Sequence, residues 1–148
     1  GVGQRGYGED ADRRGGVMSG LMMFENREIG RNDIEAILAA LPLVMITKNV
    51  DVIQQEINGS FCVSAANKLR EMIETKRRMD FRINEVRVMF AAVEAANVLL
   101  SGGMADDLIE IREIDGQWKK ELEKNFFAYR KLANLFEKML EPYMNDLS

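Results

Sequence analysis

Apolar side chains recur every seven residues along two long stretches of the chain. Residues 60–100 contain neither Gly nor Pro, and two neighbouring rows there are apolar at eight of ten positions. The first row is Met72, Met79, Val86, Val93 and Leu100, and the second is Leu69, Lys76, Ile83, Phe90 and Asn97. This period is typical of an α-helix that buries one stripe of its surface. The pattern predicts one long helix over about residues 60–100, weakest from Lys76 to Asp80, where four of five residues are charged.

A second stretch with the same period covers about residues 104–141. Its rows are Leu108, Asp115, Leu122, Tyr129 and Phe136, and Ile111, Trp118, Asn125, Leu132 and Met139. Ser101, Gly102 and Gly103 separate the two stretches, and glycine after a helix readily adopts the left-handed conformation that ends it. Because so short a turn brings the two helices side by side, the sequence predicts a long antiparallel αα-hairpin.

Two shorter elements are predicted before the hairpin. Asn32 and Asp33 are favourable residues at a helix amino terminus, and the apolar spacing that follows them predicts a short helix ended by Pro42. Residues 43–46 read as an apolar connector, and residues 49–57 predict a second short helix ended by Asn58 and Gly59. The predicted fold class is therefore all-α: a helical bundle built on the long hairpin, with two short amino-terminal helices.

The first part of the chain has a different composition. Seven of the 12 glycines fall within residues 1–20, among charged residues and almost no large apolar ones, so this segment has little with which to form a core. We expect a Gly-rich arm and a Met-rich lead-in over residues 1–31. A single helical domain is expected over residues 32–148, since 148 residues suit one domain. The arm is either the remnant of an added tag, held in place by packing, or a native segment that straps neighbouring subunits together.

Composition and charge remove several classes of function. The chain has no His and a single Cys, Cys62, so the commonest general base and an intramolecular disulfide are both missing. Its net charge of −4 makes nucleic acid an unlikely partner, because phosphate binding requires gathered positive charge. No membrane span is expected, since the most apolar segment, residues 86–100, contains Arg87 and Glu94. The cytoplasm is the default compartment, with secretion or a virion left open.

Three acidic residues after the glycine turn are weak candidates for a metal site. Asp106 and Glu110 are four residues apart on a predicted helix, with Asp107 beside them, and Glu94 and Asn97 lie near the same end of the hairpin. Carboxylates in this pattern suit Mg²⁺, which would make the protein a small all-helical phosphohydrolase. The simpler interpretation is that Asp106 and Asp107 complement the dipole of a helix amino terminus. We therefore assign no catalytic residue, metal or cofactor.

Apolar side chains outside the two rows indicate a protein-binding surface. Two short helices cover only one face of each long helix, which leaves several large side chains in need of cover. The candidates are Phe81, Val88, Phe127 and Leu135 on the long helices, together with Met22, Met23 and Phe24 in the Met-rich segment before the first helix, since Met is common on surfaces that accept a partner helix. The function expected is a non-enzymatic assembly or interaction subunit, such as a scaffold, a chaperone or a filament component, with copies of itself as the first expected partner. The alternatives are the Mg²⁺-dependent phosphohydrolase and a minor helical component of a nucleoprotein complex.

Overall fold

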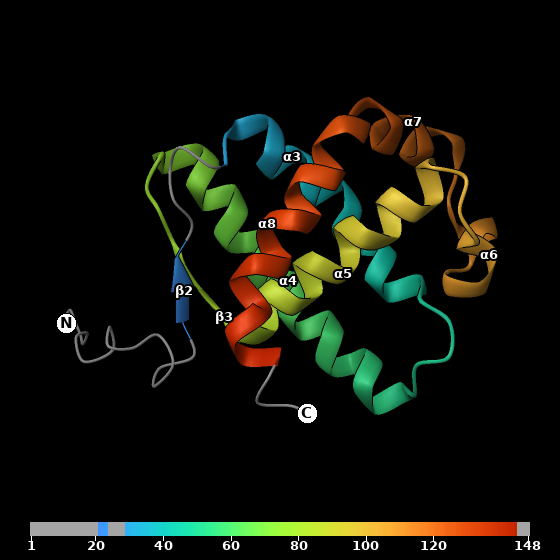
Figure 1. Cartoon of the computed structure of the whole chain (residues 1–148), viewed down its shortest axis with the longest axis horizontal. Helices are drawn as coiled ribbons and strands as arrows, with labels where there is room; N and C mark the ends of the chain where they lie inside the picture. Colours follow the sequence, from blue (N-terminus) through green and yellow to red (C-terminus); the bar gives the residue numbers. More distant parts are fainter. Residues whose placement is uncertain (1–20, 24–28, 145–148) are drawn as a thin grey trace.

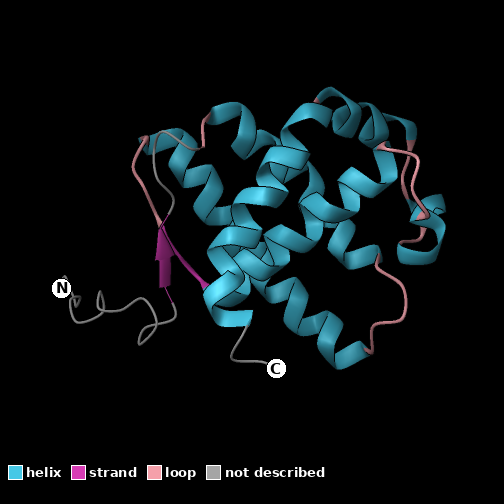
Figure 2. Cartoon of the chain, in the orientation of Figure 1, coloured by secondary structure: helices cyan, strands magenta, loops and turns pink. Residues whose placement is uncertain are grey.

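The part of the chain that the structure describes is mostly helical (Figures 1 and 2). The structure is a computed structural model that describes residues 21–23 and 29–144. The prediction of an all-α fold class is confirmed. In chain order, the elements are β2 (Leu21–Met23), α3 (Arg31–Ala40), the 3₁₀ helix η1 (Leu41–Ile46), α4 (Val52–Thr75), β3 (Asp80–Arg82), α5 (Ile83–Leu100), α6 (Ala105–Leu108), the 3₁₀ helix η2 (Ile111–Glu113), α7 (Gly116–Lys124) and α8 (Phe126–Met144).

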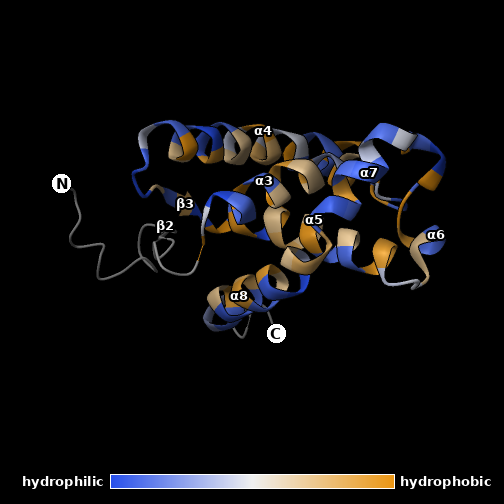
Figure 3. Ribbon diagram, turned by 90° about the horizontal axis from the view of Figure 1, so that it is seen from above, coloured by the Kyte–Doolittle hydropathy of each residue, from blue (hydrophilic) through white to orange (hydrophobic). Residues whose placement is uncertain are grey.

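Helix α5 is the central element. It contacts α8, α4, α3 and η1, and α4 and α8 lie on opposite sides of it (Figure 3). Val86, Met89 and Val93 are fully buried on this helix, and so are the small residues Ala92 and Ala96. Alanine leaves room for neighbouring helices to approach closely, so α5 is covered from more than one direction. The fold therefore has three layers, and the two predicted long segments meet where α5 packs against α8.

The predicted helix over residues 60–100 is two helices. Helix α4 begins at Val52, where the Asp51 carboxylate accepts a hydrogen bond from the Gln54 N–H at 2.8 Å, and it continues through Asn58 and Gly59 to Thr75. The predicted second short helix is therefore the first part of α4. The chain leaves α4 at Lys76, whose φ of 59° is left-handed, and α5 starts only at Ile83. The interruption covers the charged stretch that the sequence marks as weakest.

The predicted helix over residues 104–141 is also interrupted. The chain at Ile109 is extended and pairs with the segment after η1: the Lys48 N–H donates to Leu108 O and the Glu110 N–H donates to Ile46 O, both at 2.9 Å. These bonds compete with continued helix, and Ile109 is fully buried there. Asp115 belongs to a predicted heptad row, but in the structure it caps the amino terminus of α7. Its carboxylate accepts a hydrogen bond from the Trp118 N–H.

Two further helix ends were predicted from the sequence, one at the glycine turn and one at the end of the last helix. The glycine turn is confirmed: α5 ends at Leu100, and Gly102 has a φ of 83°. The predicted end of the last helix at about residue 141 is wrong, since α8 runs through Pro142 to Met144.

The lead-in before α3 contributes a strand. β2 pairs antiparallel with β3, with Leu21 opposite Arg82, Met22 opposite Phe81 and Met23 opposite Asp80. The break between α4 and α5 provides the extended residues on which β2 forms. Phe24 lies outside the described residues, as does the Gly-rich arm over residues 1–20.

Replacing Val86 with Asp tests the central position of α5. Val86 is fully buried, so an unpaired carboxylate there should lower the free energy of unfolding by about 3–5 kcal/mol. Urea and thermal unfolding followed by circular dichroism measure the change. Val52→Asp, at a position that is 75% exposed, is the matched control and should change stability by less than about 0.5 kcal/mol. Equal melts for the two variants would contradict this placement of α5.

Candidate functional site

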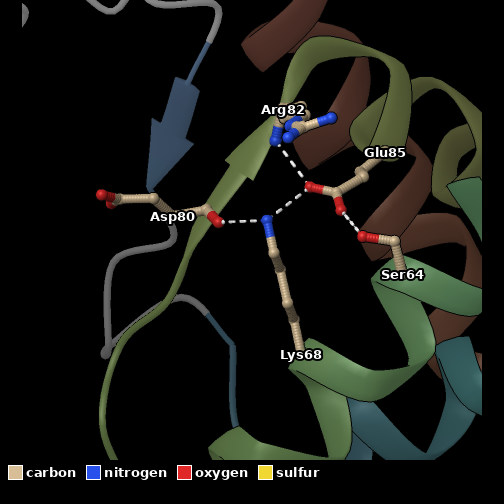
Figure 4. A network of polar contacts seen from close by, with 5 residues as sticks. All are labelled: Ser64, Lys68, Asp80, Arg82 and Glu85. Carbon is tan, nitrogen blue, oxygen red and sulfur yellow. Dashed lines mark hydrogen bonds and ion pairs between the residues drawn. The ribbon is translucent and has the colours of Figure 1, made fainter.

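A buried carboxylate joins α4 to the start of α5 (Figure 4). Glu85 accepts hydrogen bonds from Lys68 Nζ at 2.8 Å, from the Arg82 N–H at 2.7 Å and from the Ser64 hydroxyl. Lys68 also donates to the carbonyl oxygen of Asp80 at 2.9 Å. The Glu85 side chain is only 1% exposed and that of Lys68 is 25% exposed, so the ion pair is largely shielded from water.

The electrostatics of this group show what the carboxylate does. Burial by itself raises the pKa of Glu85, but the hydrogen bonds from Lys68, Ser64 and the Arg82 N–H outweigh burial and hold the pKa below its usual range. The ammonium of Lys68 also lies 5.4 Å from the centre of the Phe81 ring. Because the carboxylate is occupied by three donors from the protein itself, this network acts as a structural clamp on the break between α4 and α5.

Further polar tethers attach α7 and α8 to α3. Trp118 Nε1 donates to the Ala39 carbonyl at 2.8 Å and the Tyr129 hydroxyl donates to the Ala36 carbonyl at 2.9 Å. Tyr129 is fully buried, and burial raises its pKa. These bonds satisfy the polar ends of two aromatic side chains inside the fold, so they stabilise the packing of the helices.

Cys62 has no catalytic setting. Its thiol is buried near the Leu41 carbonyl, and burial raises its pKa to about 11. The thiolate, which is the nucleophilic form, is therefore scarce at neutral pH.

The acidic residues considered for a metal site lie in α6, directly after it, and in α5. Asp106 and Asp107 are exposed in the single turn of α6, and Glu110, which follows it, lies 4.0 Å from Arg112. Glu94 is on α5, where burial and the nearby charge of Glu137 raise its pKa. Within the described ranges, no group of three or more Asp, Glu, Cys or His side chains is arranged to hold a metal ion.

The candidate interaction residues lie in different environments. Phe81 and Val88 are 0% and 6% exposed and belong to the core, so the expectation that they need cover from another molecule is wrong. Phe81 is covered because the break after α4 turns it inward beside Lys68, and Val88 is one of the buried residues of α5. Leu135 is half-buried and Phe127 is 91% exposed. The backbone of Met22 and Met23 pairs with β3.

The clearest uncovered surface lies on α4, which runs along one side of the molecule (Figure 3). The helix turns Cys62, Ala65, Leu69 and Met72 toward the core. On the opposite side, every residue at a spacing of three or four is exposed, and we call this set the α4 outer face. Its members are Val52, Glu56, Ser60, Val63, Asn67, Arg70 and Glu74.

Apolar side chains are prominent on and beside this face. Val52 is 75% exposed and Val63 is 62% exposed, and Ile53, at the edge of the face, is 71% exposed. Farther round α4, a pocket of about 350 Å³ opens toward α5, lined by Gln54, Ile57, Asn58, Phe61, Asn84, Arg87 and Val88. Sequence reasoning missed this surface because it divided α4 at Asn58 and Gly59. Val52 and Val63 therefore fell within two separate predicted helices, and neither was identified as part of a surface.

No protein-family model, no curated protein and no solved structure matches the chain. Among the helices of the described residues, none is both long enough and apolar enough to cross a membrane.

The clamp should be visible in the pH dependence of stability. Because the folded state lowers the pKa of Glu85, its contribution is complete above the unfolded pKa, near 4.3, and is lost as pH falls through the folded pKa. We expect Glu85→Gln to cost about 1–3 kcal/mol at pH 7 and to flatten the loss of stability below about pH 4.5. Urea midpoints between about pH 7 and pH 3 measure both effects. Glu35→Gln, at an exposed ion pair, is the control and should leave the slope unchanged; the same slope in Glu85→Gln would contradict the clamp.

Asp106 and Asp107 should behave as surface charges. Replacing both with Asn should change stability by less than about 1 kcal/mol, because each carboxylate is exposed in the first turn of α6. Calorimetric titration of the intact chain with Mg²⁺ and Mn²⁺ should show no saturable binding. Binding tighter than about millimolar that is lost in the double variant would instead support the metal-dependent alternative.

Proposed function

We propose that this protein is a non-enzymatic helical assembly subunit that acts through helix packing. The observation that supports this proposal is the α4 outer face, together with Ile53 at its edge. Single exposed apolar residues are common on proteins, but here Val52, Ile53 and Val63 lie exposed on one side of one helix. A face of this kind suits an opposing helix, which would cover the apolar side chains and pair with the polar ones beside them.

The charges on the face favour protein over nucleic acid as the partner. Glu56 and Glu74 carry negative charge and Arg70 carries positive charge, so the face has mixed sign. Binding to a phosphate backbone requires several cations gathered on one surface. A protein surface with mixed charges is a better match, because opposite charges then pair across the contact.

Self-association of the intact chain tests the proposed function. We expect the average mass in sedimentation velocity to rise with concentration across the micromolar range, and replacement of both Val52 and Val63 with Ser to reduce this rise. The reason is that both valines are more than half exposed on the free chain and would lie within the contact, Val63 at its centre and Val52 at its end. Circular dichroism checks that the variant stays folded.

Phe127→Ser is the matched control, because Phe127 is 91% exposed and belongs to α8. It should leave association unchanged. The mass of a single chain at every concentration would contradict an assembly role, and association lost only in the Phe127 variant would place the contact elsewhere.

A further inference from the structure

We infer that the α4 outer faces of two copies pair antiparallel, about a two-fold axis at Val63. The inference rests on the proposed function and specifies the partner and its orientation. It begins with the positions of two charges: Glu56 lies seven residues before Val63 and Arg70 lies seven residues after it. The face therefore carries opposite charges at equal distances from one exposed apolar residue.

The geometry of α4 puts these three side chains nearly in a line. Seven residues turn an α-helix through about 700°, which is close to two full turns, and advance it by about 10 Å. Glu56 and Arg70 are both exposed, and Val63 between them is 62% exposed. A partner helix laid along this line would meet all three together.

The charges decide the direction of pairing. In an antiparallel pair centred on Val63, Glu56 of each copy faces Arg70 of the other, which forms two equivalent ion pairs on either side of a valine contact. In a parallel pair with the same centre, Glu56 would face Glu56 and Arg70 would face Arg70. Like charges at those positions oppose association, so the face is self-complementary only when the helices run in opposite directions.

The side chains needed for this contact are available. Within the described part of the chain, neither Glu56 nor Arg70 takes part in an ion pair; Arg70 Nη1 reaches Asn67 Oδ1 at 3.4 Å. Ser60 and Asn67, the members of the face on either side of Val63, are uncharged and shorter than Glu or Arg. The second helix can therefore approach Val63 without burying an unpaired charge next to it.

The size of the contact sets its expected strength. One pair of helices offers less area than the roughly 1,600 Å² of a standard stable interface, so we expect a reversible dimer with a Kd in the range of about 1 to 100 µM. At the ends of the contact Val52 comes opposite Glu74, since each is eleven residues from Val63. These ends are open to water, so the central valine and the two ion pairs should carry the specificity.

Charge reversal tests the register. Sedimentation velocity on the intact chain should show Glu56→Arg and Arg70→Glu each weakening the dimer about tenfold, because each places two like-charged pairs across the contact. The variant with both reversals should recover the wild-type Kd within about threefold, since opposite charges again face each other. Arg130→Glu, an exposed reversal on α8, should have little effect.

A cysteine placed on the two-fold axis gives an independent test. Val63→Cys should form a disulfide-linked dimer under mild oxidation, since the two positions meet at the axis. Val52→Cys should not, because in this register its two copies lie about 33 Å apart along the helices. The wild-type chain is the control: its buried Cys62, with a pKa raised to about 11, should not crosslink.

The outcomes separate the register from the proposed function. Restored dimerisation in the double reversal, with crosslinking at Val63 and not at Val52, supports the antiparallel pair. If Val63→Asp disrupts the dimer but the double charge reversal does not restore it, the antiparallel register is wrong. The face then still acts in assembly. A wild-type chain that stays monomeric over the whole range overturns both.

Discussion

The buried ion pair between Lys68 and Glu85 is the constraint on which the arrangement of the helices depends. Taking a carboxylate out of water is costly unless donors surround it, and Glu85 obtains them from α4, through Lys68 and Ser64, and from the Arg82 N–H at the start of α5. The carboxylate thus fixes how α5 begins relative to α4. The same ammonium holds the Asp80 carbonyl, so the extended residues of β3 are positioned by the clamp as well.

The break that this clamp stabilises also determines which surfaces are free. With α4 and α5 as separate helices, α5 enters the middle layer and is covered by α4 on one side and α8 on the other (Figure 3). Helix α4 then needs only one buried side, and its outer face is left to solvent. Val86, Met89 and Val93 of α5 fill the fully buried positions of the core. Val52 and Val63 of α4 lie on the side that no other described helix covers, so they stay exposed.

Hydrophobic periodicity alone predicted the all-α class and many core positions. Val86, Val93, Leu122, Tyr129 and Phe136, all chosen from the heptad rows, are fully buried. The glycine turn after Leu100 was also predictable from the sequence. A residue in the left-handed conformation after a helix favours glycine in any tertiary context. These features depend on local spacing and local backbone preference, which the sequence carries directly.

Continuity of the helices and the identity of the exposed face were decided by tertiary structure. The Lys68 and Glu85 pair joins residues 17 positions apart, and the pairing of Ile109 with the segment after η1 joins parts of the chain about 60 residues apart. Such contacts compete with the hydrogen bonds of a continuing helix, and a periodic pattern does not reveal which will prevail. The pattern likewise shows which side of α4 is more apolar only after the helix boundaries are known. The sequence determined the stripes that are buried, and the long-range polar contacts determined where each helix ends and which apolar side chains stay exposed.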